Sequence, residues 1–178
     1  LQGVYKAGYY KQMNDIDLAS WISANSATTG WVPVGYGGSG TIVYDGDNHK
    51  ITGLWTNTTG NYTGLFSSIS SGTIKNLTLQ LNAKQVKGGD YTGALIGRIN
   101  EGSIENVTAT GNVSASSFVG GIAGYTTNCS LKQLSYSGQV TASGPAGGIT
   151  AYASNQPVTS CEVTGSTIKS TGGNVGGL

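Results

Sequence analysis

A five-residue motif recurs at nearly constant spacing through the last two thirds of the chain. It occupies residues 62–66, 91–95, 118–122, 145–149 and 174–178. Its marker glycines are 29, 27, 27 and 29 residues apart; they are Gly64, Gly93, Gly120, Gly147 and Gly176. Self-similarity at such a period is the signature of a repeat architecture, in which each repeat is one supersecondary unit.

A second motif keeps the same phase as the first. It has aliphatic residues three positions apart, and it occupies residues 72–77, 102–107, 130–134 and 157–161. Two motifs in fixed phase over four copies make a chance similarity implausible. We therefore align the chain on these motifs.

Each repeat holds three short stretches in which apolar and polar residues alternate. In the second copy they are residues 93–99, 103–110 and 112–115. A period of two indicates half-buried strands. Three strands in 27 to 29 residues are typical of one coil of a parallel β-helix, and one coil cannot bury its apolar face without neighbours. We predict an all-β fold, a right-handed parallel β-helix (solenoid) of stacked three-strand coils with an N-terminal capping region.

Composition agrees with packed β structure rather than disorder. Glycine accounts for 30 of 178 residues, and only 10% are charged. Low charge alone does not separate the two, but disordered chains have few aromatic residues. This chain has 10 Tyr and 3 Trp, so we assign the glycines to turns.

Stacking the repeats in register predicts columns of equivalent side chains. One inward aliphatic column is Phe66, Leu95, Ile122 and Ile149, and beside it lies a small-residue column of Ser68, Gly97, Gly124 and Ala151. Three further inward columns are Ile74, Ile104, Leu131 and Val158; Leu77, Val107, Leu134 and Cys161; and Val113, Val140 and Ile168. Cys129 and Cys161 fall in different columns, so we expect no disulfide between them.

Residues 1–59 differ from the repeats and are predicted to form an N-terminal cap and the coils that lead into them. All three tryptophans, Trp21, Trp31 and Trp55, lie here. Weak helical periodicity is confined to residues 16–22, and residues 41–51 look like a β-hairpin around an Asp-Gly-Asp-Asn turn. Residues 60–178 form about four coils and a truncated fifth, in one continuous domain. We expect the last coil to be covered by a continuation of the parent chain or by a partner, because an open coil exposes strand edges.

The chain resembles the GLUG-repeat proteins, a bacterial β-helix family. The matching repeat residues are 64–66, 73–77, 103–107 and 120–125, and the matching upstream residues are 15–18, 31–35 and 44–51. The resemblance covers about residues 14–178 and departs from the family at Ser67, Thr150 and Pro157. It implies a place in a large secreted or surface protein of bacteria, such as an adhesin-like protein or the non-catalytic region of an immunoglobulin-A-cleaving metallopeptidase.

The titratable residues suggest no catalytic constellation. A zinc peptidase needs two His on one helical face, whereas this chain has only His49. A Ser–His–Asp arrangement would have to combine His49 with Asp45 or Asp47, which belong to a turn by their local chemistry. The eight acidic residues form no stacked pair of the kind that glycoside hydrolysis uses. We therefore predict no enzyme and no cofactor, with a glycan-cleaving β-helix as the alternative.

Two kinds of binding site remain open. Asp45 and Asp47 offer closely spaced oxygens for a cation, although the pattern lacks the later Gly and Glu of an EF-hand, and a turn held by Asx hydrogen bonds explains it equally. The candidates for glycan binding are Trp55, Tyr62, Tyr91, Tyr125 and Tyr152. The alternative is that these rings only cover the turns of their own coils. Asn76 and Asn106 share a column and are expected to stack through side-chain hydrogen bonds.

These observations indicate a non-catalytic structural or interaction module, secreted or on the bacterial cell surface, that serves adhesion or display. A net charge of +1 indicates no basic face for binding nucleic acid. The sequence has no run of 18 apolar residues, so we expect no segment that inserts into a membrane. The expected partner is a host or bacterial surface protein or a glycan. A carbohydrate-active β-helix that binds or cleaves glycans is the alternative.

Overall fold

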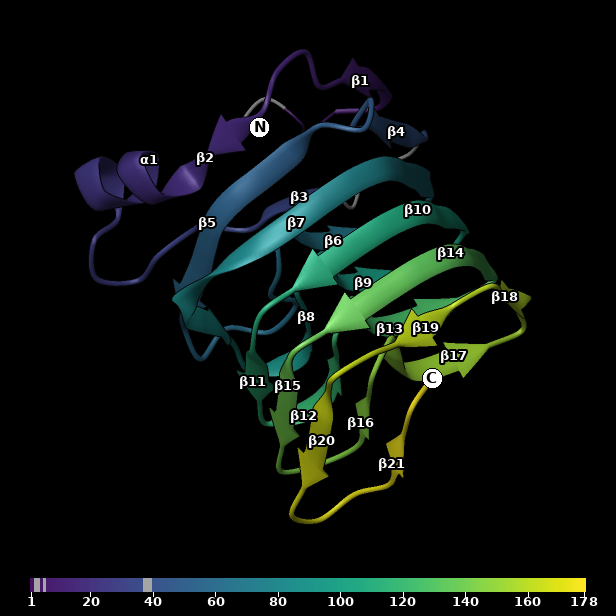
Figure 1. Ribbon diagram of the computed structural model, residues 1–178. Helices are drawn as coiled ribbons and strands as arrows, with labels where there is room; N and C mark the ends of the chain where they lie inside the picture. The colour runs from purple at the N-terminus through teal and green to yellow at the C-terminus, as the bar shows by residue number, and fades with distance from the viewer. Residues whose placement is uncertain (2–3, 5, 37–39) are drawn as a thin grey trace.

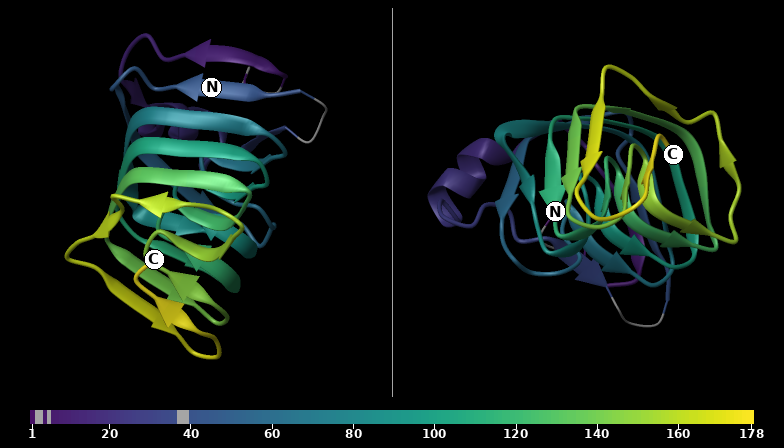
Figure 2. Two further views of the ribbon diagram at one scale, coloured as in Figure 1. Left: turned by 90° about the vertical axis from the view of Figure 1, so that its right-hand side faces the viewer. Right: turned by 90° about the horizontal axis from the view of Figure 1, so that it is seen from below.

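The computed structural model describes residues 1, 4, 6–36 and 40–178. It is a β-solenoid of stacked parallel coils with one helix at its N-terminal end (Figures 1 and 2). Every pair of named strands is parallel. The predicted all-β solenoid is therefore confirmed.

Three sheets form the walls of the solenoid. The longest wall follows the order β18-β14-β10-β7-β11-β15-β20, with β19 beside β14. Its strands are β7 (Gly72–Lys87), β10 (Gly102–Thr110), β11 (Val113–Ala115), β14 (Cys129–Ser137), β15 (Gln139–Ala142), β18 (Val158–Thr159), β19 (Glu162–Val163) and β20 (Thr167–Ser170). β7 spans the whole wall because it pairs with β10 along its first part and with β11 near its end.

The other two walls are shorter. One has the order β21-β16-β12-β8 and the other β17-β13-β9-β6-β3. Their strands are β8 (Asp90–Gly93), β12 (Ser117–Gly120), β16 (Ala146–Gly147) and β21 (Val175–Gly176); and β3 (Val34–Tyr36), β6 (Phe66–Ile69), β9 (Ile96–Ile99), β13 (Ala123–Thr127) and β17 (Thr150–Ser154).

The N-terminal segment stacks on the first repeat as further strands of the long wall. Its elements are β1 (Gly8–Lys11), β2 (Ile16–Asp17), α1 (Leu18–Asn25), β4 (Ile42–Asp45) and β5 (Lys50–Asn57). Asp17 begins α1, because its carboxylate accepts a hydrogen bond from the Ala19 N–H at 2.9 Å as an N-cap residue does. The weak helical signal at residues 16–22 thus marks a real helix that starts two residues later.

The predicted hairpin at residues 41–51 is wrong. β4 and β5 do not pair with each other; β4 pairs with β1 and β7, and β5 pairs with β2 and β7, all in parallel. The Asp-Gly-Asp-Asn sequence forms a corner after which the chain continues along the same wall. The backbone of Asp47 and Asn48 has positive φ there, a conformation that Asn and Asp tolerate.

Three predicted columns have the expected register. Ile74, Ile104, Leu131 and Val158 pair in succession, and so do Leu77, Val107 and Leu134. Val113 pairs with Val140, and Val140 with Ile168. Ile74, Ile104, Leu131, Val113 and Val140 are at most 1% exposed, so each contributes roughly 1.5–3 kcal/mol by burial.

Two predicted columns are shifted by one residue in the first repeat. Phe66 pairs with Ile96 and not with Leu95, and Ser68 pairs with Arg98 and not with Gly97. The second repeat has one more residue than the first between the bridged pair Thr63–Thr92 and this strand. Aligning on the marker glycines therefore placed the first repeat one residue out. From the second repeat onward the register holds, since Ile96, Ala123 and Thr150 pair in succession.

The core is one cluster of buried apolar residues that runs from Val4 to Ile149. Cys129 is buried and Cys161 is half-buried, and both thiols are free, as their separate columns predicted. Beyond Ile149 the side chains of the last coil are more exposed: Val158 is 37% and Val175 is 51% exposed.

Candidate binding face

Two columns of aromatic side chains stand side by side where the two short walls meet. The first is Tyr62, Tyr91 and Phe118, in which neighbouring ring centroids lie 5.2 and 5.1 Å apart and the rings are nearly parallel. The second is Tyr125 on β13 and Tyr152 on β17, whose rings stack at 4.4 Å with an interplanar angle of 1°. We call these five side chains the aromatic face.

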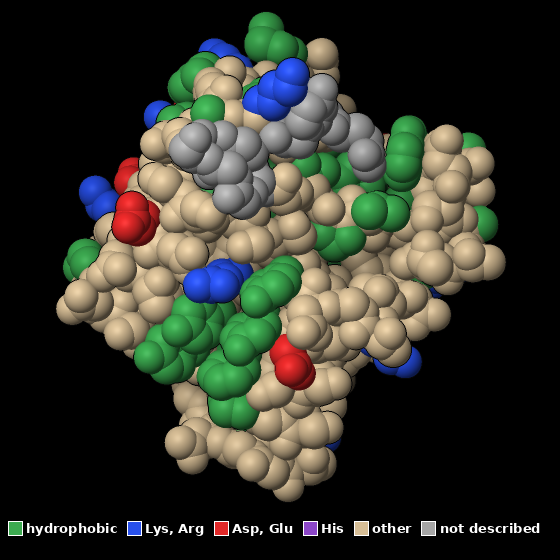
Figure 3. Space-filling view, turned by 180° about the vertical axis from the view of Figure 1, so that it is seen from behind, with side chains coloured by type: hydrophobic (Ala, Val, Ile, Leu, Met, Phe, Trp, Pro, Cys, Tyr) green, Lys and Arg blue, Asp and Glu red, His purple; other side chains and the backbone are tan. Residues whose placement is uncertain are grey.

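The two columns pack against each other edge to face. Tyr91 meets Tyr125 at 5.6 Å and 88°, and Phe118 meets Tyr125 at 6.2 Å and 76°. Edge-to-face packing is favourable because the positive edge of one ring meets the negative face of another. The aromatic face is therefore a preorganised herringbone that spans four coils. Figure 3 shows a band of hydrophobic side chains on this side of the molecule, with basic and acidic side chains at its borders.

The backbone of the first column is strained. Tyr62, Tyr91 and Phe118 have φ values of 58°, 60° and 51°, in the left-handed region where bulky residues are outliers. Such residues persist only where the surroundings hold them, at a cost of about 1–3 kcal/mol each. In three successive coils, packing therefore holds an aromatic residue in a backbone conformation that its side chain disfavours.

Glycines under the rings permit the close approach of the chain. A Cβ atom on Gly124 would lie 2.5 Å from the backbone nitrogen of Thr92 and 2.6 Å from the carbonyl carbon of Tyr91. Gly97 would meet the backbone of Tyr62 in the same way. Gly97 and Gly124 of the small-residue column therefore have no room for a side chain, because the backbone of the turns that carry the aromatic rings packs directly on them.

Arg98 brings a positive charge to the aromatic face. Its guanidinium lies 5.7 Å from the centroid of the Tyr125 ring, and its Nε donates to Oδ1 of Asn100 at 2.7 Å. A cation over an aromatic ring is attracted by the ring quadrupole. The face therefore combines ring surface with a fixed hydrogen-bond donor group.

Four of the five predicted glycan-binding residues come together, and Trp55 does not. Tyr62, Tyr91, Tyr125 and Tyr152 lie in the aromatic face, whereas Trp55 is on β5, is 7% exposed and lies under the ammonium of Lys84 at 4.4 Å. Phe118 was missed as a site residue, although its place in the column of Tyr62 and Tyr91 could have identified it.

The carboxylates of Asp45 and Asp47 are engaged by protein groups. Asp45 is 7% exposed and accepts hydrogen bonds from Tyr9, Asn76 and the Asp47 N–H, each at 3.0 Å. Lys75 lies 3.4 Å from Asp45, and Lys11 lies 3.0 Å from Asp47. Burial alone would raise the pKa of Asp45, but these donors outweigh it and hold the pKa at about 2. The turn interpretation accounts for both residues, and no group of three or more metal-ligating side chains occurs in the described ranges.

His49 pairs with an acid other than the two considered from the sequence. Its Nδ1 lies 3.1 Å from Oδ1 of Asp15, which also accepts from the Lys50 N–H at 2.9 Å. The His49 backbone lies at the corner between β4 and β5, where its carbonyl accepts from the Thr78 N–H. The contact ties the N-terminal segment to that corner.

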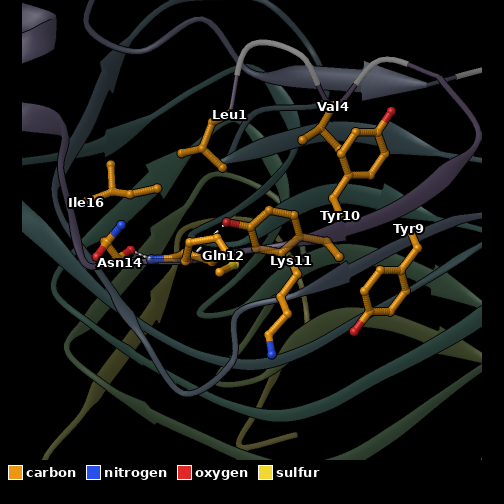
Figure 4. A pocket seen from close by; sticks show the side chains of 10 residues that line it. Leu1, Val4, Tyr9, Tyr10, Lys11, Gln12, Asn14 and Ile16 are labelled. Carbon is orange, nitrogen blue, oxygen red and sulfur yellow. Dashed lines mark hydrogen bonds between the residues drawn. The ribbon is translucent and has the colours of Figure 1, made fainter.

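A cavity of about 500 Å³ opens at the N-terminal end of the solenoid (Figure 4). Apolar side chains such as Val4, Tyr10 and Ile16 line it together with Gln12. The Gln12 amide donates to the carbonyls of Asn14 and Lys50 and accepts from the Tyr44 hydroxyl. The polar atoms of the Gln12 side chain therefore all have partners within the protein. Apart from the tyrosine hydroxyls and the chain terminus, Lys11 is the one ionisable group among the described residues that line this cavity.

Comparison with known proteins places a GLUG motif at residues 88–114. This confirms the resemblance seen in the sequence for that repeat, and the motif belongs to a non-catalytic repeat family. A protein of Evansella cellulosilytica named "Putative Gly-rich membrane protein" is 38% identical over 108 residues, which are 57% of this chain and 12% of that protein. The match thus spans about an eighth of the relative. No solved structure matches.

The described part of the chain contains no helix that is long and apolar enough to cross a membrane. The GLUG motif and the bacterial relative suggest a bacterial surface module.

Proposed function

We propose that this chain is a non-catalytic display and adhesion module of a secreted or cell-surface bacterial protein. The observation that carries the proposal is the aromatic face: a preorganised surface built from strained backbone on a solenoid of parallel sheets. Stacked parallel coils form an extended rod. A rod that carries the aromatic face can hold a ligand at a distance from the cell surface to which the module is attached.

The ligand class that fits this face is a neutral glycan. Sugar rings present apolar C–H faces that pack on aromatic rings and hydroxyls that accept from groups such as Arg98. Tyr62, Tyr91, Tyr125 and Tyr152 would contact the sugars together with Phe118. The continuous run of rings over four coils favours an extended chain over a single monosaccharide.

Two experiments test the proposal. In the first, insoluble polysaccharides such as cellulose, mannan and xylan are sedimented with the protein. The Tyr91→Asn/Tyr125→Ser variant should lose retention, since Asn tolerates the left-handed backbone of Tyr91 while removing its ring. The Tyr9→Ser variant, which removes an exposed ring on β1, should retain it. If rings only cover their own turns, the double variant will instead lower the melting temperature while retention follows the folded fraction.

The second experiment addresses the glycan-cleaving alternative. The protein is incubated with the same polysaccharides in soluble form and the release of reducing ends is followed. The proposal expects none above a buffer blank. Turnover that disappears on replacing one acidic residue would refute the non-catalytic assignment.

A further inference from the structure

A second surface, distinct from the aromatic face, runs along the corner between the long wall and the wall of β8, β12 and β16. Two cavities, of about 390 and 380 Å³, share the side chain of Lys87. The first includes Trp55, Asn57, Lys84 and Gln85, and the second extends from Thr58 across every later coil to Thr171. With strands about 4.8 Å apart, the second cavity alone is a groove roughly 19 Å long.

One row of outward residues follows this groove. Lys87, Ser114 and Thr141 line it, and Lys169 continues the row on the last coil, two residues before the lining residue Thr171. Lys87 pairs with Ser114, Ser114 with Thr141, and Thr141 with Lys169. Their neighbours Val86, Val113 and Val140 are at most 1% exposed and point into the core, so alternation directs the row outward. Two lysines therefore stand three coils apart, roughly 14 Å, with two hydroxyls between them.

Several side-chain polar groups along the groove have no partner among the residues that the structure describes. The hydroxyls of Ser114, Ser116, Thr141 and Ser143 make no hydrogen bond within the described chain, and neither Lys87 nor Lys169 forms an ion pair there. These side chains can therefore bind a ligand without breaking an internal contact.

Charge in the groove has one sign. Lys84 and Lys87 line one cavity, and among the described residues neither cavity is lined by an acidic side chain. The Lys84 ammonium lies over the Trp55 ring, which fixes a cation without neutralising it. The whole chain has a net charge of only +1, so this basic strip is local.

We propose that the groove binds a linear acidic polysaccharide lying along the stacking axis. The lysines would contact its anionic groups through charge-assisted hydrogen bonds, and the free hydroxyls would contact sugar hydroxyls. Mixed anion and hydroxyl recognition separates this ligand from a nucleic acid, for which phosphate contacts alone supply most of the affinity. The site is independent of the aromatic face and of the function proposed for it.

Affinity electrophoresis in gels containing polygalacturonate tests this proposal, with neutral dextran and single-stranded oligothymidylate as comparison polymers. The protein should be retarded by polygalacturonate only, and retardation should weaken with salt. Lys87→Gln/Lys169→Gln should weaken binding at least about tenfold, from the loss of two ionic contacts. The double variant should melt normally because both side chains are exposed and unpaired.

Lys132→Gln provides the matched control. Lys132 is exposed on β14, in the strand row of Glu105 and Thr159 and not in the row of Lys87 and Lys169, and this variant should bind as the wild type does. The Tyr91→Asn/Tyr125→Ser variant should also bind polygalacturonate normally, so failure of the aromatic face and failure of the groove are distinguishable. Absence of retardation, an equal loss in Lys132→Gln, or equal retardation by oligothymidylate would overturn the proposal.

Discussion

The side-chain amide of Asn106 donates a hydrogen bond to Oδ1 of Asn76 in the adjacent coil at 3.0 Å. Asn76 in turn donates to Oδ1 of Asp45 at 3.0 Å. Both asparagines have left-handed backbone, with φ values of 55° and 50°. Asparagine thus provides this corner in two successive coils and the hydrogen bond between them, as the sequence column predicted.

Asn106→Ala should destabilise the fold by about 1–2 kcal/mol. Alanine has a Cβ atom but no polar side chain that hydrogen-bonds locally, so it is strained in the left-handed region. Asn106→Gly should cost less, since glycine adopts that conformation without steric penalty. Urea unfolding measures both. Equal losses for Ala and Gly would show that the side-chain hydrogen bond, and not the backbone conformation, dominates at this corner.

Tyr136→Phe should cost about 1–2 kcal/mol in the free energy of unfolding. The Tyr136 side chain is fully buried, and its hydroxyl donates to the carbonyls of Gly111 at 2.7 Å and Gln139 at 3.2 Å. The variant leaves two partly buried carbonyl groups without this donor. Tyr62→Phe serves as the control because its hydroxyl bonds no described residue, and it should leave the unfolding midpoint unchanged.

A thiol reagent should modify one cysteine in the native protein and two after unfolding. Cys129 is fully buried, and burial raises the pKa of its thiol to about 12, so little reactive thiolate forms. Cys161 is half-buried in the more exposed last coil. Mass spectrometry after maleimide treatment should find the label on Cys161; rapid native labelling of Cys129 would contradict the core assignment.

Stability should fall in acid between about pH 4 and pH 2 through Asp45. Its folded-state pKa of about 2 lies below the ordinary value of about 3.9 for the unfolded chain. The stabilisation is therefore complete above the unfolded pKa and is lost as the pH falls through the folded one. Melting temperatures of Asp45→Asn should depend less on pH in this window than those of the wild type. Glu101→Gln, at an exposed residue, should behave like the wild type.

Much of the fold follows from the sequence because each coil repeats the same chemistry. The columns through Ile104, Val107 and Val113 were predicted in register, since alternation and two motifs in phase leave little freedom. Tyr125 and Tyr152, both predicted as glycan-binding candidates, stack because the same register holds between their coils. Register was wrong only where one repeat has an added residue, at Phe66 and Ser68, which spacing between glycines does not reveal.

Local turn chemistry misled the prediction in the N-terminal segment. The Asp-Gly sequence at Asp45 is a strong hairpin signal, but the neighbouring β7 offers a parallel edge to both β4 and β5, and this tertiary pairing wins. Trp55 was predicted as a glycan-binding candidate because its packing against Lys84 and Gly30, which are distant in sequence, cannot be seen from the sequence. The groove at Lys87 and Lys169 was also missed, since its residues meet only when the coils stack.

The central claim is that the aromatic face binds glycans rather than merely covering its own turns. A glycan array probed with the wild type and with the Tyr91→Asn/Tyr125→Ser variant at equal folded concentration tests this most directly. The account predicts that the wild type binds extended neutral glycans and that the folded variant does not. Equal signals from the two proteins, or no neutral glycan bound by the wild type, would contradict it.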